Sequence, residues 1–150
     1  MNITIGSDHG AVDLKEEVKM VLHEFSDIQV TDVGTFGKES VDYPDIAEKV
    51  CADIVSGKAD RGIVLCGTGI GISIAANKIN GIRAALCGDV YSAIMSRKHN
   101  DANVLAMGGR VTGIGPAGEV VRAWVCTEFE GGRHARRVDK IMALEQQKDS

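Results

Sequence analysis

Residues 61–81 read RGIVLCGTGIGISIAANKING, and this stretch decides the fold. It opens with an unbroken apolar run at residues 63–65, which is typical of a central strand in a parallel sheet covered on both faces. Three glycines then alternate with other residues over 67–71, so the backbone can turn sharply and leave N–H groups free at the start of a helix expected near Ile72. The stretch therefore predicts a buried strand, an anion-binding loop and a helix, in that order.

Cys66 lies where the predicted strand meets the glycine-rich loop. Ligands bind at the carboxyl ends of strands in open α/β sheets, and a helix amino terminus favours a thiolate over a thiol. A reactive thiol facing the loop is therefore one interpretation, and a small buried hydrophobe is the other. The loop is not a dinucleotide fingerprint, because its third glycine would fall at Ile72, and no Gly-Lys-Ser/Thr of a P-loop follows.

The composition indicates one globular domain with a core of its own, since the 150 residues are 44% apolar. A net charge of −4 argues against a general binder of nucleic acid or of membrane surfaces. No apolar run approaches the roughly 18 residues of a membrane span, and the N-terminus reads as a strand rather than a signal peptide, so we expect a cytoplasmic protein. The 4 cysteines are scattered without a C-x-x-C pair, which predicts neither a disulfide framework nor a zinc site.

Strand and helix patterns alternate along the chain. The predicted strands cover 2–5, 28–33, 61–66, 82–87 and 103–107, and all of them read as buried. The predicted helices cover about 14–25, 44–55, 72–79, 90–98, 116–130 and 133–147. In the first helix, Lys15 belongs to the charged face that is expected in solvent. The alternation predicts a doubly wound, Rossmann-like α/β fold, a three-layer α/β/α sandwich around about five parallel strands.

Polar groups follow three of the predicted strands. Asp8 and His9 follow the first strand, Cys66 and Thr68 the third, and Arg110 the fifth. Since parallel strands share one carboxyl edge, we expect these groups to line a single crevice. Thr68 can donate a hydrogen bond there, to the thiolate or to a substrate oxygen. Asp8 and His9 fit equally well as ordinary turn formers.

Three further candidates have a functional and a plain interpretation each. His99 and Asn100 end the helix before the fifth strand, at the amino edge of the sheet, so they either serve the site of a neighbouring molecule or cap the helix without chemistry. Arg133 and Arg137 share a helical face one turn apart, which fits a phosphate clamp or a solvated surface. Tyr43 is either a packed loop aromatic or a lid over a substrate.

Taken together, these segments resemble the type B ribose-5-phosphate isomerase family, which also contains galactose-6-phosphate and allose-6-phosphate isomerases. The resemblance covers essentially the whole chain. It rests on GSDHG (6–10), DYPD (42–45), CGTGIGISIAANK (66–78), GIRAALC (81–87), SRKHNDANVLAMGGRV (96–111) and EGGRHARRV (130–138).

The resemblance implies roles for the candidate residues. Cys66 matches the base that moves a proton between C1 and C2 of the sugar, and His99 matches a residue that helps to open the sugar ring. We expect Thr68 and Asp8 to belong to the same catalytic set. The expected substrate contacts are Asp8, His9, Tyr43, Gly67, Thr68, Gly69, Ile70, Gly71, Asn100, Arg110, Arg133 and Arg137.

The resemblance also implies an assembly. The family is built as dimers whose sites use both subunits, so we expect a homodimer, or a dimer of dimers, with shared sites and the helix over about 133–147 at the interface. The expected small-molecule partner is a phosphosugar. We expect no metal, no organic cofactor, no nucleic acid and no membrane.

The implied reaction interconverts ribose 5-phosphate and ribulose 5-phosphate through a cis-enediolate, a step of the pentose phosphate pathway, with further activity on allose 6-phosphate or related sugars. The alternative is galactose-6-phosphate or allose-6-phosphate isomerase as the main role. Some relatives have a glutamate base where this chain has Ile72, so Cys66 favours the cysteine route. Two other classes remain open: a Cys–His hydrolase or transferase, and a phosphosugar-binding or nucleotide-binding regulator in which Cys66 is only packed.

Overall fold

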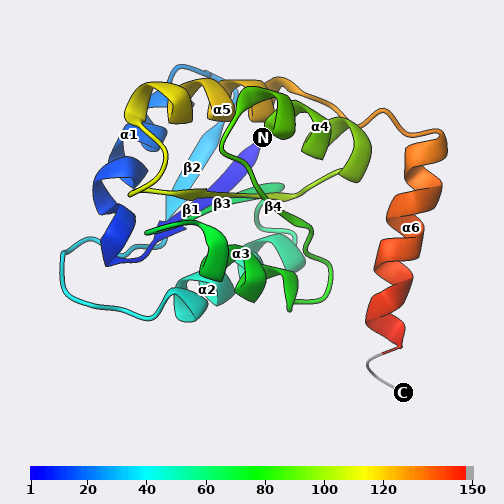
Figure 1. Cartoon of the computed structure of the whole chain (residues 1–150), viewed down its shortest axis with the longest axis horizontal. Helices are drawn as coiled ribbons and strands as arrows, with labels where there is room; N and C mark the ends of the chain where they lie inside the picture. The colour runs from blue at the N-terminus through cyan, green and yellow to red at the C-terminus, as the bar shows by residue number, and fades with distance from the viewer. Residues whose placement is uncertain (148–150) are drawn as a thin grey trace.

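The computed structural model describes residues 1–147, which form a parallel five-stranded sheet between two layers of helices (Figure 1). The strands are β1 (Asn2–Ser7), β2 (Gln29–Asp32), β3 (Arg61–Cys66), β4 (Ala84–Leu86) and β5 (Val104–Gly108). The helices are the short 3₁₀ turn η1 (His9–Ala11), α1 (Val12–Leu22), α2 (Tyr43–Val55), α3 (Ile70–Asn77), α4 (Val90–Asn100), α5 (Ile114–Cys126) and α6 (Arg133–Gln146). The predicted α/β sandwich is confirmed. None of the helices within residues 1–147 has the length and apolar character needed to cross a membrane.

The sheet has the order β2-β1-β3-β5-β4, and every neighbouring pair is parallel. The three inner strands are almost wholly buried, whereas β2 and β4 are partly exposed. The expectation that all strands are buried is therefore wrong for the edges, because an edge strand has a neighbour on one side only. The register pairs Ser7 with Leu65 and Cys66 with Gly108, so the ends of β1, β3 and β5 meet at one edge.

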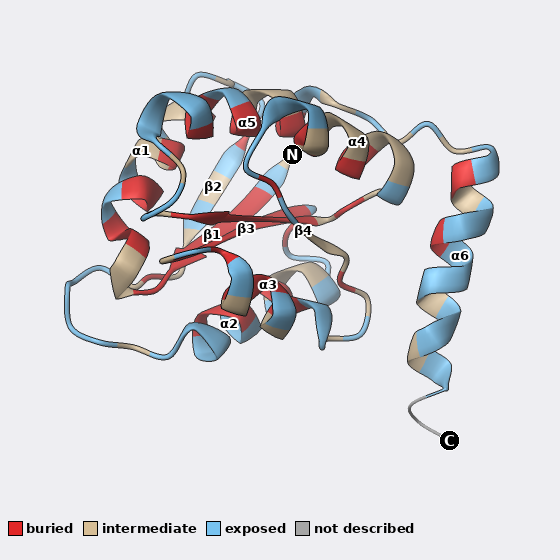
Figure 2. Cartoon of the chain, in the orientation of Figure 1, coloured by how far each residue is buried: buried red, intermediate tan, exposed pale blue. Residues whose placement is uncertain are grey.

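Helices α1, α4 and α5 cover one face of the sheet, and α2 and α3 cover the other (Figure 2). The first layer encloses the fully buried Trp124, and the second packs around Val50 and Ile72. Strand β3 contributes to both cores, Leu65 to the first and Val64 to the second, because successive strand residues point to opposite faces. This placement between two layers explains why β3 reads as a continuous apolar run.

Several boundaries differ from the prediction. Helix α3 begins at Ile70 rather than near Ile72, because Gly69 already turns the chain with a φ of +79°. Helix α5 begins at Ile114, so Pro116 is its third residue, a position whose N–H has no partner within a helix. Strand β4 is shorter than expected, since the N–H of Arg83 donates to the Asn103 side chain at 2.8 Å.

Helix α6 stands apart from the sandwich (Figure 1). It contacts α4, and at its far end the Glu145 carboxylate accepts a hydrogen bond from the Gly81 N–H at 2.9 Å. Ile141 and Leu144 on this helix remain 43% and 55% exposed. An apolar strip on a helix held away from the core offers surface that another chain can cover.

Lys15 is wholly buried, although the sequence pattern predicts it on the solvated face of α1. The reason is that this face meets the end of β2, where Lys15 Nζ donates to Asp32 Oδ1 at 2.8 Å and to the Thr35 carbonyl at 2.7 Å. Lys19 Nζ donates to Asp32 Oδ2 at 2.9 Å. Burial acts to raise the pKa of Asp32, but the hydrogen bonds from the two lysines outweigh it and hold that pKa below its ordinary value. Lys15 thus ties α1 to the loop after β2.

Replacing Lys15 with methionine should lower the free energy of unfolding by about 1.5–3 kcal/mol, because the Asp32 carboxylate and the Thr35 carbonyl lose a buried charged donor. Chemical denaturation at neutral pH measures this loss. Lys38→Met is the matched control, since Lys38 pairs with Asp13 in solvent at 3.0 Å, and an exposed ion pair contributes about 0–1 kcal/mol. Equal losses in the two variants would contradict a structural role for Lys15.

Candidate active site

Cys66 ends β3 at the carboxyl edge of the sheet, with 4% of its surface exposed. Its Sγ accepts a hydrogen bond from the backbone N–H of Gly69 at 3.1 Å. Gly69 can turn its N–H back to the sulfur because its φ of +79° lies in the left-handed region. A Cβ at this position would lie 2.6 Å from Leu86 Cδ1 and 2.7 Å from the carbonyl carbon of Met107. The loop therefore folds closely over the thiol, and it requires a glycine to do so.

The other cysteines have different surroundings. Burial raises the pKa of Cys51 to about 12, and it also raises the pKa of Cys87. Both thiols lie in the hydrophobic cores, whereas Cys126 is exposed at the end of α5. Cys66 is buried as well, but it lies at the sheet edge with a backbone donor directed at its sulfur.

The turn after β1 lies directly beside the glycine loop. Asp8 Oδ1 accepts a hydrogen bond from the Gly10 N–H at 2.9 Å, and a Cβ on Gly10 would lie 3.3 Å from the nitrogen of Gly67. Arg110 reaches the same loop, because its backbone N–H donates to the Gly67 carbonyl at 2.9 Å. Its Nη1 would lie 3.3 Å from a Cβ on Gly67. The three strand ends that the sequence predicted to converge do meet here.

A hollow at this edge is lined by His9 and by residues 40–45, which include Tyr43. The Val41 N–H donates to His9 Nδ1 at 3.2 Å, so the proton of a neutral His9 lies on Nε2. Tyr43 covers Gly71, since a Cβ on that glycine would lie 2.5 Å from Tyr43 Cζ. The phenol packs on the loop yet stays 40% exposed, which confirms the packed aromatic and leaves the lid over a substrate a prediction.

Thr68 and Ile70 lie on the outer side of the loop, and both are exposed. Thr68 Oγ1 accepts a hydrogen bond from the Ile70 N–H at 3.2 Å. Accepting this bond uses one lone pair, which leaves the hydroxyl proton available for donation. Ile70 is the first residue of α3, where the backbone N–H groups are not paired within the helix.

A second group of candidate residues lies at the opposite edge of the sheet. Helix α4 ends at Asn100, just before β5, and the register pairs Val104 with Gly62, four residues ahead of Cys66. Four residues of a strand span about 13 Å, so His99 and Asn100 are held away from Cys66 of their own chain. The structure therefore separates the two candidate groups, as the topology predicted.

The first turn of α6 joins this second group. The rings of His99 and His134 stack, with centroids 4.1 Å apart and an interplanar angle of 10°. Arg133 and Arg137 are exposed on the same helix. Burial lowers the pKa of His134, and the nearby charges of His99, Arg133 and Arg137 lower it further against the opposing effect of Glu130. Sequence reasoning singled out the arginines but not the stack, because nothing in the local pattern links two residues so far apart in the chain.

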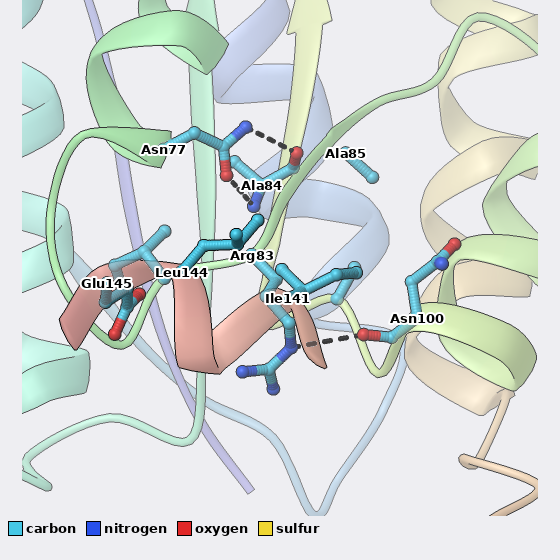
Figure 3. A pocket seen from close by; sticks show the side chains of 10 residues that line it. Asn77, Arg83, Ala84, Ala85, Asn100, Ile141, Leu144 and Glu145 are labelled. Atoms are coloured by element: carbon cyan, nitrogen blue, oxygen red, sulfur yellow. Dashed lines mark hydrogen bonds between the residues drawn. The ribbon is translucent and has the colours of Figure 1, made fainter. Parts of the chain in front are cut away.

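A separate hollow of about 370 Å³ lies between β4 and α6 (Figure 3). Asn77 closes the edge of β4 there, since its amide donates to the Ala84 carbonyl at 2.9 Å and accepts from the Ala84 N–H at 2.8 Å. Asn100, Ile141 and Leu144 line the same hollow. It therefore adjoins the His99 group rather than Cys66.

A family model described as Ribose/Galactose Isomerase matches residues 3–141. The chain belongs to this family. It is 48% identical to ribose-5-phosphate isomerase B of Escherichia coli K12, over 98% of both chains. It is 47% identical to D-erythrulose-4-phosphate isomerase of Pectobacterium atrosepticum, over 98% of this chain and 97% of the relative. The solved structure of Clostridium thermocellum ribose-5-phosphate isomerase B is 55% identical and superposes with a TM-score of 0.96 over 99% of each chain. The protein is therefore an isomerase.

Gly69→Ala should lower isomerase activity at least about 10-fold and destabilise the fold by about 1–2 kcal/mol or more, because a Cβ would strain the left-handed backbone and meet Met107. Activity assays and thermal unfolding measure the two effects. Gly88→Ala is the control, since a Cβ at that glycine meets no atom within 4 Å. Full activity in the Gly69 variant would show that the loop tolerates another conformation.

Proposed function

We propose that the protein interconverts ribose 5-phosphate and ribulose 5-phosphate, with Cys66 as the base that moves the proton between C1 and C2. The observation that carries the proposal is the hydrogen bond from the Gly69 N–H to Cys66 Sγ, because it fixes the sulfur directly beside the glycine loop that would hold the enediolate. Similarity over nearly the full length to proteins named ribose-5-phosphate isomerase B supports the choice of substrate.

The chemistry starts from the open-chain aldose. Cys66 takes the proton from C2, the electron pair left behind forms the double bond between C1 and C2, and negative charge moves to O1. Return of the proton to C1, with transfer of the proton on O2 to O1, forms the C2 carbonyl and the C1 hydroxyl of the ketose. Atoms and electrons balance within the sugar, so the step requires no separate oxidant or reductant.

The glycine loop holds the charge of the enediolate in this mechanism. Unpaired N–H groups at the start of a helix stabilise an oxyanion because they are fixed before the reaction begins. Such groups follow Ile70 at the start of α3, whose own N–H donates to Thr68 Oγ1. Gly67 and Gly71 put no side chain between the backbone and a sugar, and the Thr68 hydroxyl can donate to a substrate oxygen. Asp8, His9 and Arg110 surround the same loop.

We further propose that His99 opens the sugar ring and that Arg133 and Arg137 hold the phosphate, but in the site of a partner subunit. Both arginines are exposed, and arginine pairs well with phosphate oxygens. His99 and Cys66 belong to opposite edges of one sheet, so a two-fold dimer is the simplest assembly that brings them together. The exposed apolar side chains of Ile70 and Ile141 offer surface for such an interface.

A four-carbon sugar phosphate is a second candidate substrate, because a relative at 47% identity is named D-erythrulose-4-phosphate isomerase. Assays with ribose 5-phosphate, erythrose 4-phosphate, allose 6-phosphate, galactose 6-phosphate and free ribose distinguish the candidates. Turnover of ribose 5-phosphate but not of free ribose supports the phosphate clamp. Tight binding without turnover of any sugar would instead favour a phosphosugar-binding regulator, and a covalent adduct on Cys66 would favour nucleophilic catalysis.

Cys66→Ala should lower kcat for ribose 5-phosphate by roughly 10²-fold to 10⁴-fold, the usual weight of a general base. Exchange of the substrate C2 proton with deuterium from solvent should disappear with it, as proton NMR can follow. Cys126→Ala, at the exposed cysteine on the end of α5, is the matched control and should keep wild-type turnover. Wild-type turnover in the Cys66→Ala variant would contradict the proposal that Cys66 is the base.

Mixing inactive Cys66→Ala with inactive His99→Ala protein should restore activity, because a mixed dimer has one site with both changes and one site with neither. Random exchange makes half of the dimers mixed, so the expected recovery is about a quarter of the wild-type activity. Subunit exchange is verified by native mass spectrometry with one isotopically labelled variant. Complete exchange without recovery would assign both residues to the same subunit's site.

A further inference from the structure

His134 is a buried histidine with a ring partner and no part in the proposed chemistry. It belongs to the first turn of α6, is 6% exposed, and stacks face to face on His99 with ring centroids 4.1 Å apart. His99 lies in the last turn of α4 and is partly buried. Parallel rings at this distance restrict rotation of the imidazole, because either ring can turn only by losing contact with the other.

Glu130 connects His134 to the end of α4. The Glu130 carboxylate lies 3.7 Å from His134 Nε2, and the Glu130 backbone N–H donates to the Lys98 carbonyl at 3.1 Å. This second contact ties the segment before α6 to the residue preceding His99. Burial lowers the pKa of His134, and the nearby charges of His99, Arg133 and Arg137 lower it further.

The same residues have the composition of a zinc site, since ligand atoms of His99, Glu130 and His134 lie within 4.8 Å of one another. The geometry favours a different interpretation. Stacked imidazoles direct their nitrogen lone pairs side by side rather than at a common point, and a tetrahedral zinc site needs donors that converge at about 2 Å from the ion. Arg133 and Arg137 also add positive charge nearby, which opposes a cation.

We propose that His134 is a positioning residue that holds the His99 imidazole in the orientation needed to open a cyclic sugar phosphate. The proposal rests on the proposed function and extends it to substrate choice. His134 stands between Arg133 and Arg137 in the sequence, on the helix assigned to the phosphate. The start of α6 therefore both binds the phosphate and orients the imidazole that opens the ring.

The role predicts different effects on cyclic and acyclic substrates. Ribose 5-phosphate closes a five-membered ring through its O4, so an isomerase must open that ring before C2 can lose its proton. Erythrose 4-phosphate carries its phosphate on O4 and cannot close this ring. Loss of His134 should therefore slow the five-carbon substrate and spare the four-carbon one, because only the former needs His99 for ring opening.

The experiment compares His134→Ala, His134→Leu and His134→Phe on both substrates. With ribose 5-phosphate, the alanine and leucine variants should lose about 10-fold to 100-fold in kcat at little change in KM, the usual cost of misplacing a catalytic group by about 1 Å. His134→Phe keeps a flat ring against His99 and should recover most of the loss. With erythrose 4-phosphate, all three should stay within about threefold of wild type. His23→Ala, an exposed histidine at the end of α1, is the control.

Each outcome decides one of the two claims. Equal losses on both substrates, or no rescue by phenylalanine, would overturn the positioning role and leave the proposed function intact. If wild type fails to convert ribose 5-phosphate, the proposed function fails and the positioning role falls with it. Circular dichroism and native mass spectrometry check that the variants keep their fold and assembly. If the alanine and leucine substitutions disturb the fold or the assembly, the phenylalanine variant still decides, since it should keep most of the wild-type kcat on both substrates.

Discussion

The hydrogen bond between the Gly69 N–H and Cys66 Sγ requires a left-handed turn directly after a buried strand, and the rest of the carboxyl edge is arranged around that turn. The neighbouring elements approach so closely that side chains are excluded at several points. Gly10 meets the backbone of Gly67, and Gly71 meets the ring of Tyr43. Close backbone contact between three strand ends and one loop gives the thiol a rigid surrounding with little room for water.

The parallel topology imposes a second constraint. Residues that directly follow strands lie at the carboxyl edge of the sheet, and residues that end helices lie at the amino edge. Cys66 belongs to the first set and His99 to the second, so a mechanism that uses both implies contact between chains. Helix α6 fits such an assembly, because it stands away from the sandwich and exposes Ile141 and Leu144 (Figure 1).

Two buried polar side chains, Lys15 and His134, connect separate elements of this fold. Lys15 joins α1 to Asp32 and to the Thr35 carbonyl, at the start of the loop that leads to Val41, whose N–H bonds His9. The stack of His99 on its histidine partner has a similar effect at the other edge. Lys15 therefore holds the loop that leads toward His9, and the proposed role of His134 is to hold the His99 ring directly.

The sequence by itself determined the α/β sandwich, the strand-loop-helix unit around Cys66 and the meeting of three strand ends, because these follow from hydrophobic periodicity, glycine spacing and the rule for parallel sheets. It also indicated that His99 lies at the far edge. Only the tertiary structure decided that Lys15 is buried, that β5 lies between β3 and β4, and that His134 stacks on His99. These features depend on contacts between residues distant in the chain, and a local pattern of polarity is the same whether or not such a contact forms.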